Sequence, residues 1–118
     1  SGGTELIVGV SNDPEWGLAI TVGAGGVLTE GLGDSQTRLL PIDEEEAKGM
    51  VLSLKSVKLL QGFRGSPPAD MDALARAIVA VGDAAAALGP DLAALEVNPL
   101  RVAGDEIEAL DALAVWAS

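Results

Sequence analysis

Strand-forming segments lie at both ends of this 118-residue chain, and helix-forming segments lie between them. The strand-forming segments have alternating, β-branched or apolar sequences, and they are residues 4–10, 18–22, 92–100 and 107–115. Two shorter strands are predicted at residues 27–30 and 37–40. Strands that cluster in this way pair as antiparallel hairpins, whereas a wound parallel sheet needs strands that alternate with helices. The order therefore predicts an α+β fold, with helices packed on one face of an antiparallel sheet.

The first helix is expected to begin at Asp43. The side chain of Asp43 is placed to accept a hydrogen bond from the amide of Glu46, and that glutamate is placed to reach back, which is the reciprocal arrangement of a capping box. The residues expected to form the buried stripe of this helix are Ala47, Met50, Val51 and Leu54. A short helical piece is predicted to follow at residues 57–61.

The longest helix is predicted at residues 69–88. Its apolar positions fall near the 3.6-residue repeat of a helix, and they are Met71, Leu74, Ile78, Val81 and Leu88. Gly89 and Pro90 end the pattern, because glycine favours the residue after a helix and proline cannot continue one.

The net charge of the chain makes two classes of binding partner unfavourable. The chain has 18 acidic and 7 basic residues, for a net charge of -11. Nucleic acids and anionic membrane surfaces attract basic patches, so neither is expected to bind here. The ordinary explanation of such acidity is solubility, and the alternative is that some carboxylates hold a metal ion.

Cysteine and histidine are both absent. Disulfides, thiolate metal sites and nucleophiles activated by histidine are therefore excluded, and a reducing compartment suits the chain. The sequence has no apolar run of about 18 residues and no leader-like N-terminus, so we expect a cytoplasmic protein. The chain enters its first strand directly after Ser1-Gly2-Gly3, which indicates that residues 1–118 are one domain cut from a longer protein.

The last hairpin has the most informative geometry. A two-residue turn at Gly104 and Asp105 would be type II′, with glycine at the first central position. Counting outward from this turn sets Asn98 directly opposite Asp111, with Cβ atoms about 4.5–5.5 Å apart. Glu96 precedes Asn98 by two residues, so its side chain points to the same face.

An amide oxygen and a carboxylate at that separation are suitable ligands for one hard cation. Mg²⁺ prefers oxygen ligands and keeps waters and substrate phosphates in its shell, so Asn98 and Asp111 would be enough protein ligands. The alternative is an ordinary polar pair on a solvated sheet face. A bulge at Pro99, which cannot donate to the ladder, would also break the register.

Three residues in glycine-rich segments are candidates for binding phosphate. Gly25 and Gly26 are placed to direct backbone amides at a phosphate, although a plain tight turn explains them equally well. Arg64 lies between glycines, and its planar guanidinium pairs well with phosphate oxygens. Arg38 is a weaker candidate of the same kind. For both arginines the alternative is a surface ion pair.

Six motifs, in order, resemble the C-terminal lobe of the ATP-grasp domain of NDP-forming acyl-CoA synthetases, the group of ADP-forming acetate–CoA ligases. The resemblance covers nearly the whole chain. The motifs are GTELIVGV and DPEWG at residues 3–17, GAGG with Glu30, LLQGFRG at residues 59–65, LEVNPL at residues 95–100 and ALDA at residues 109–112. The Glu-x-Asn-Pro-Leu stretch is also shared with succinyl-CoA synthetase β subunits.

The resemblance implies roles for the candidates. Asn98 and Asp111 would hold Mg²⁺ beneath the phosphates of ATP or ADP. Glu96 would lie beside the centre that a phosphohistidine loop from another domain visits. The reaction implied is the reversible conversion of acyl-CoA, ADP and phosphate to acid, CoA and ATP. The other ATP-grasp lobe and the CoA-binding domains would be partners in the same or another chain, and the isolated chain would be inactive.

Two other functions compete with this one. A degenerate lobe would serve for docking or regulation in a larger protein of the acyltransferase type. A stand-alone anion-binding module would bind phosphate without catalysis. The presence of Glu96, Asn98 and Asp111 together favours an active parent enzyme.

Overall fold

The chain folds into a six-stranded antiparallel sheet with two α-helices on one side. The computed structural model describes residues 3–24, 34–62 and 67–117. The elements in chain order are β1 (Thr4–Asp13), β2 (Gly17–Ala24), β3 (Ser35–Leu39), α1 (Glu44–Leu52), the 3₁₀ helix η2 (Val57–Leu60), α2 (Met71–Ala87), β4 (Leu92–Ala103), β5 (Glu106–Ala109) and β6 (Ala112–Trp116). The expected fold class is confirmed. The short strand predicted at residues 27–30 lies outside the described residues.

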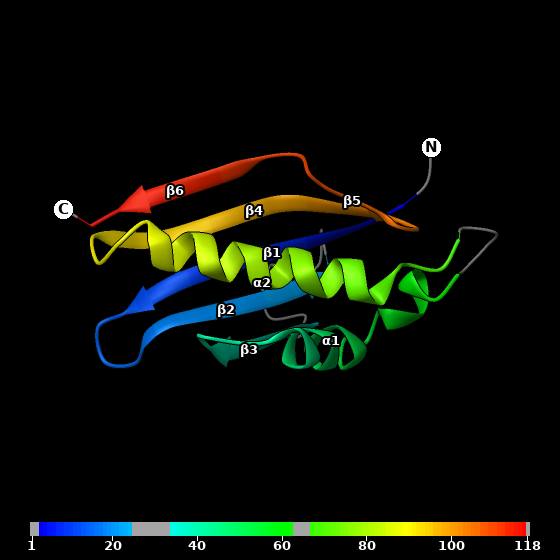
Figure 1. Ribbon diagram of the computed structural model, residues 1–118, viewed down its shortest axis with the longest axis horizontal. Helices are drawn as coiled ribbons and strands as arrows, with labels where there is room; N and C mark the ends of the chain where they lie inside the picture. The colour runs from blue at the N-terminus through cyan, green and yellow to red at the C-terminus, as the bar shows by residue number, and fades with distance from the viewer. Residues whose placement is uncertain (1–2, 25–33, 63–66, 118) are drawn as a thin grey trace.

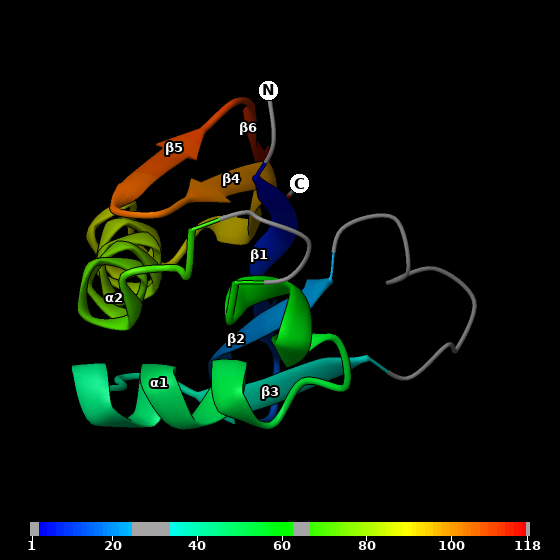
Figure 2. The same ribbon diagram turned by 90° about the vertical axis from the view of Figure 1, so that its right-hand side faces the viewer.

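The sheet is built from neighbouring hairpins. Its strand order is β3-β2-β1-β4-β5, and β6 also pairs with β4 (Figure 1). Every pairing is antiparallel. In the side view α1 and α2 lie on the same side of the sheet (Figure 2). The other face of the sheet carries no helix from the described part of the chain.

Turn chemistry closes the first hairpin. One carboxylate oxygen of Asp13 accepts hydrogen bonds from the amides of Glu15, at 2.7 Å, and of Trp16, at 3.0 Å. Gly17 has a φ of +84°, a left-handed value that glycine adopts without steric cost. These contacts let β1 and β2 pair without a shift in register from Leu6 to Asp13.

The capping box predicted for α1 is present. Oδ1 of Asp43 accepts a hydrogen bond from the amide of Glu46 at 2.8 Å, and Oε1 of Glu46 accepts one from the amide of Asp43 at 3.4 Å. Two otherwise unpaired amides at the helix start are thereby satisfied. The expected apolar stripe of this segment is fully buried or nearly so at Ala47, Met50, Val51 and Leu54.

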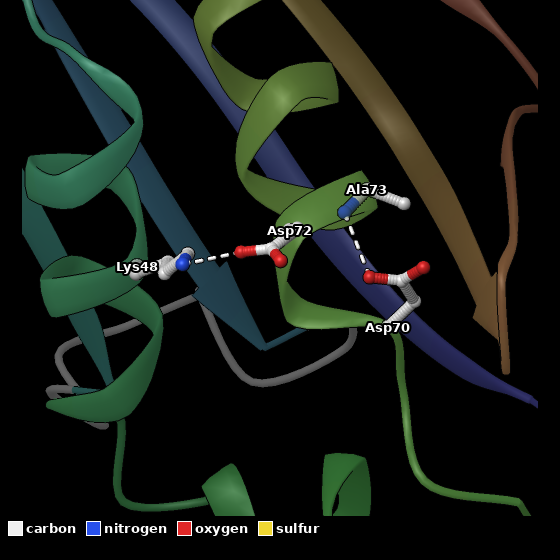
Figure 3. A network of polar contacts seen from close by, with 4 residues as sticks. All are labelled: Lys48, Asp70, Asp72 and Ala73. Carbon is white, nitrogen blue, oxygen red and sulfur yellow. Dashed lines mark hydrogen bonds and ion pairs between the residues drawn. The ribbon is translucent and has the colours of Figure 1, made fainter.

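A second aspartate caps α2. Oδ1 of Asp70 accepts a hydrogen bond from the amide of Ala73 at 3.0 Å (Figure 3). Next to this cap, Lys48 of α1 and Asp72 of α2 form an ion pair that joins the two helices (Figure 3). Both side chains of the pair are well exposed, so it contributes little to stability.

The buried face of α2 differs in part from the predicted stripe. Leu74 and Ile78 are fully buried, but Leu88, which follows the helix, is 42% exposed. Small residues occupy the remaining buried positions of the helix, at Ala75, Gly82 and Ala85. A Cβ atom at Gly82 would lie only 2.9 Å from Cδ2 of Leu40. The helix therefore packs too close to its neighbours for large side chains, which periodicity alone does not reveal.

The core lies between the helices and the sheet. Its fully buried large side chains come from both layers and include Leu6, Ile20, Met50, Leu74 and Ile78. In β1 the alternate residues Leu6, Val8 and Val10 face this core. No helix in the described ranges has the length and apolar character needed to cross a membrane.

Candidate functional site

The register predicted for the last hairpin is confirmed. Ala103 pairs with Glu106 on either side of a two-residue turn, and Gly104 has the positive φ, +61°, that its position requires. The same count continues beyond the hairpin, because Val97 pairs with Ala112. From Ala103 back to Ala94 of β4, therefore, β5 and β6 follow one after the other at a single register, which shifts only between Ala94 and Leu92.

The strand predicted at residues 107–115 is interrupted, which corrects the sequence expectation. It is divided into β5 and β6 by Leu110 and Asp111, which lie opposite Pro99 and Asn98. Pro99 has no N–H group to donate to the ladder, so regular pairing stops there. Two bonds span the gap: the amide of Asn98 donates to the carbonyl of Asp111, and the amide of Leu110 donates to the carbonyl of Pro99, both at 3.0 Å.

The pairing of β4 with β1, on the side away from β5 and β6, is also irregular. Leu6 of β1 pairs with Leu100, but Val8 pairs with Val97, so β4 uses one residue more than β1 over this stretch. Such a bulge reverses the alternation of side chains between the two faces. Val97 and Leu100 are consequently both buried, although three positions separate them, while Asn98 between them is exposed.

The three predicted side chains line one pocket. Glu96, Asn98 and Asp111 are exposed and line a pocket of ≈150 Å³ together with Ala112 and Leu113. Glu96 alternates along β4 with Leu95 and Val97, which face the core. The pocket therefore opens on the sheet face opposite the helices.

The donor set of this pocket suits one kind of cation. It combines two carboxylates with an amide oxygen, and Oδ1 of Asp111 accepts a hydrogen bond from the amide of Ala112 at 2.9 Å, which helps to orient the carboxylate. Within the described ranges no group of three or more His, Cys, Asp and Glu residues is arranged to hold a metal. An amide and a carboxylate fit Mg²⁺ that retains waters or phosphate oxygens, and they do not make a complete protein cage.

A second hollow adjoins Glu96 on the same sheet. It has a volume of ≈270 Å³, and its lining comes from β1, β2 and β4. Gly9, Ser11 and Thr21 are among the residues that line it, and Glu96 is common to both hollows. A ligand held beside Glu96 would therefore have room to extend across β1.

The remaining candidates are not brought to this pocket by the described structure. Gly25, Gly26 and Arg64 lie outside the described residues. Nη1 of Arg38 donates hydrogen bonds within β3, at 2.7 Å to the carbonyl of Thr37 and at 3.5 Å to Oε1 of Gln36. β3 is an edge strand, and β2 and β1 separate it from β4, so Arg38 lies at the edge of the sheet far from the pocket.

Asp34 is a buried acid that sequence reasoning did not single out. Its side chain is only 7% exposed, and its two oxygens accept hydrogen bonds from the amides of Lys55, at 2.5 Å, and Ser56, at 3.1 Å. Burial raises the pKa of Asp34, but hydrogen bonds from the Ser56 side chain and from the two amides, with the charge of Lys55, leave that pKa below its ordinary value of 3.8. The available signal was weak, because a Gly-Asp-Ser stretch indicates only a turn.

Comparison with known proteins finds one domain family and several similar enzymes that act on CoA esters. A family model described as an ATP-grasp domain matches residues 1–115. A trans-feruloyl-CoA synthase from an unknown prokaryotic organism is 40% identical over 113 residues, which are 94% of this chain and 16% of that protein. The β subunit of the ADP-forming acetate–CoA ligase I of Pyrococcus furiosus is 39% identical over 110 residues, 93% of this chain and 47% of that subunit.

A solved structure has the same fold. It is a dinucleotide-forming acetyl-coenzyme A synthetase 1 of Ca. Korarchaeum cryptofilum, in complex with coenzyme A and Mg-AMPPCP, with its phosphohistidine segment pointing towards the nucleotide-binding site. The two chains are 33% identical with a TM-score of 0.87, and the match covers 98% of this chain and 54% of that one. This chain thus spans about half or less of each of these relatives.

Proposed function

The chain belongs to the ATP-grasp family, and we propose that it supplies one lobe of the magnesium–nucleotide site of an NDP-forming acyl-CoA synthetase. The complete enzyme would convert acyl-CoA, ADP and phosphate to acid, CoA and ATP, reversibly. In support, similar proteins include ADP-forming acetate–CoA ligases of Pyrococcus furiosus and Archaeoglobus fulgidus. We propose further that residues 1–118 correspond to the C-terminal lobe of the ATP-grasp domain.

The observation that carries the proposal is the pocket shared by Glu96, Asn98 and Asp111. Glu96 and Asn98 belong to β4 and alternate with the buried Leu95 and Val97, and Asp111 lies opposite Asn98 in the break between β5 and β6. The neighbouring hollow of ≈270 Å³, which Gly9, Ser11 and Thr21 help to line, leaves space for a bound nucleotide.

Asn98 and Asp111 would hold the ion in this site. The side-chain amide oxygen of Asn98 and the carboxylate of Asp111 would each supply one ligand, and phosphate oxygens and water would supply the rest. When bound, Mg²⁺ offsets the charge that develops on the transferred phosphoryl oxygens. The two side chains would position that charge from β4 and from the short break between β5 and β6, which backbone hydrogen bonds hold against β4.

Electrostatics gives a reason why the nucleotide would bind as its magnesium complex. The chain has a net charge of -11, and two carboxylates line the pocket itself. A bare polyphosphate brought against those carboxylates would be repelled, since like charges a few ångströms apart interact by about 1–4 kcal/mol even near solvent. A divalent cation between them turns this repulsion into attraction.

Glu96 would orient the imidazole that exchanges a phosphoryl group with the nucleotide. Its carboxylate stands beside the proposed magnesium ligands and borders both hollows. A carboxylate in this position can accept the N–H of a visiting imidazole and so hold the ring with its other nitrogen towards the phosphate. The chain contains no histidine, so that imidazole would come from another domain.

The test of this proposal is a pair of substitutions in the complete protein. Asp111→Ala is expected to abolish nucleotide-dependent turnover, because it removes a ligand of the ion. Asp105→Ala is the control, since Asp105 is an exposed aspartate in the turn of the same hairpin and its loss also removes one negative charge. Undiminished turnover in Asp111→Ala would contradict the proposed role of this residue.

A further inference from the structure

Gly9 lies in the interior of β1, the strand between β2 and β4 at the centre of the sheet (Figure 1). It pairs with Thr21 on one side and with Glu96 on the other. Glycine weakens the interior of a strand, because it has no side chain to pack and loses the most conformational freedom on folding. A glycine at such a position therefore marks either a demand of the backbone or the close approach of another group.

The described structure makes no such demand on the backbone at Gly9. Its φ lies outside the left-handed region, in contrast to that of Gly17. The register shift between β1 and β4 falls between Leu6 and Val8, so Gly9 is part of regular pairing. Among the described residues, the nearest atom that an added Cβ would meet is the carbonyl oxygen of Leu95, at an ordinary contact distance of 3.9 Å. Position 9 therefore has room for a side chain as far as the described chain is concerned.

Gly9 faces the hollow of ≈270 Å³ that adjoins the pocket of Glu96, Asn98 and Asp111. Glu96, Gly9 and Thr21 are directly paired on neighbouring strands, so they form one row across two strand spacings, about 10 Å. Side chains stand at both ends of this row, and Gly9 leaves its middle bare. A group that extends from Glu96 towards Thr21 would therefore lie on the backbone of β1.

The lining of this hollow suits a nucleoside. It is apolar except for the carboxylate of Glu96 and the hydroxyls of Ser11 and Thr21. Oγ1 of Thr21 lies 2.8 Å from Oγ1 of Thr37 in the next strand, so a hydrogen bond holds one of these hydroxyls in place. A nucleoside combines a flat base with ribose hydroxyls, and small-molecule sites combine apolar surface with a few placed polar groups in the same way.

We propose that Gly9 contacts the nucleotide, and that it lacks a side chain so that the nucleoside can lie across β1 between Glu96 and Thr21. This inference rests on the proposed function, because the phosphates of the same nucleotide would be held through the ion at Asn98 and Asp111. A side chain at position 9 would project into the hollow and take space that the nucleoside needs. Substitution of Gly9 leaves both carboxylates and the proposed ligands of the ion in place, so its effect is one of bulk alone.

Gly9→Ala and Gly9→Val, made in the complete protein, test the inference. The affinity for Mg-ADP, measured by calorimetry, is expected to fall about tenfold in Gly9→Ala and about a hundredfold in Gly9→Val, the range over which a fitted site discriminates against extra methyl groups. The melting temperature without nucleotide is expected to stay the same or rise, because alanine and valine are better strand residues than glycine. If Gly9→Val does not fold, Gly9→Ala decides, since its Cβ meets the described chain only at an ordinary distance.

Ala19→Val is the matched control. Ala19 lies in β2 two residues before Thr21, so it is on the same face of the sheet, and it does not belong to the lining of the hollow. The substitution adds methyl groups beside the hollow instead of within it. The affinity for Mg-ADP is expected to change by less than about twofold.

Undiminished affinity in both Gly9 variants would overturn the inference even if turnover is lost, because the hollow would then serve the segment that brings the imidazole. Equal losses in Ala19→Val, or a melting temperature that falls together with the affinity, would also overturn it, since Gly9 would then be a structural residue. A wild-type complete protein that does not bind Mg-ADP would refute the proposed function and this inference together. Binding that Asp111→Ala abolishes and Gly9→Val leaves intact would refute this inference alone.

Discussion

The amide of Asn98 donates a hydrogen bond to the carbonyl of Asp111 at 3.0 Å, and the side chains of the same two residues line one pocket. The backbone thus holds together a residue of β4 and a residue in the break between β5 and β6. Asn98 alternates along β4 with the buried Val97, so its side chain lies on the face away from the helices, and Asp111 lines the same pocket. This relationship is the structural basis of the predictions that follow.

Loss of Asn98 and loss of Asp111 are expected to be non-additive. If both residues hold the same ion, Asn98→Ala and Asp111→Ala each remove it, and the double variant has little more to lose. Nucleotide affinity of the complete protein, measured by calorimetry for the wild type, both single variants and the double variant, gives the coupling. Two independent effects that add within about 0.5 kcal/mol would show that the residues do not share an ion.

Nucleotide binding is expected to require a divalent cation. Without one, the polyphosphate meets the carboxylates of Glu96 and Asp111 and is repelled. Titration of the complete protein with ADP in magnesium buffer and in chelator should give binding only in the first case. Binding of similar affinity in both buffers would mean that these carboxylates do not contact the phosphates through a metal.

Asp34 is expected to make stability depend on pH at the acid end. Its pKa is lowered in the folded state, so its contribution is fully present above the ordinary value of 3.8 and is lost as the pH falls through the lower folded value. Asp34→Asn should lower the free energy of unfolding at pH 7 by about 1–3 kcal/mol, the cost of weakening hydrogen bonds to a buried charge. Urea unfolding at pH 7 and below pH 3.8 measures this, and the deficit of the variant should shrink in acid.

Two glycines in helices are expected to respond differently to the same substitution. Gly82→Val should lower the free energy of unfolding by about 1–3 kcal/mol, because a Cβ atom there would lie 2.9 Å from Leu40 and 3.7 Å from Ile20. Gly49→Val in α1 should change it by less than about 0.5 kcal/mol, since a Cβ atom there meets nothing within 4 Å. Thermal unfolding of both variants tests this, and equal losses would mean that close packing of α2 is not what keeps Gly82 small.

Local rules account for the parts of the fold that the sequence predicted correctly. The capping box at Asp43 and Glu46 depends on residues three apart, and the register of the last hairpin depends on the turn at Gly104. Because that register extends beyond the turn, the approach of Asn98 to Asp111 followed from counting alone. The roles of these two residues as ligands of an ion stay predictions, because the structure gives their positions and not their ligand.

Features that depend on tertiary context were missed. The strand expected at residues 107–115 is divided because Pro99 lies opposite its middle, a consequence that appears only once the partner strand is known. Leu88 fits the helical repeat, but it follows the end of α2 and is half exposed. The burial of Asp34 depends on the amides of residues 55 and 56, which are distant in sequence. In each case the deciding contact joins segments that local patterns treat separately.

The most direct test of the magnesium site is a paramagnetic one. Mn²⁺ takes the same oxygen ligands as Mg²⁺ and broadens NMR signals near it, and a chain of 118 residues is small enough for such spectra. With Mn²⁺ and ADP, the account predicts broadening centred on the amides of Asn98, Asp111 and Ala112, and its loss in Asp111→Asn. Broadening centred elsewhere on the acidic surface, or broadening at Asn98 that persists in Asp111→Asn, would contradict the account.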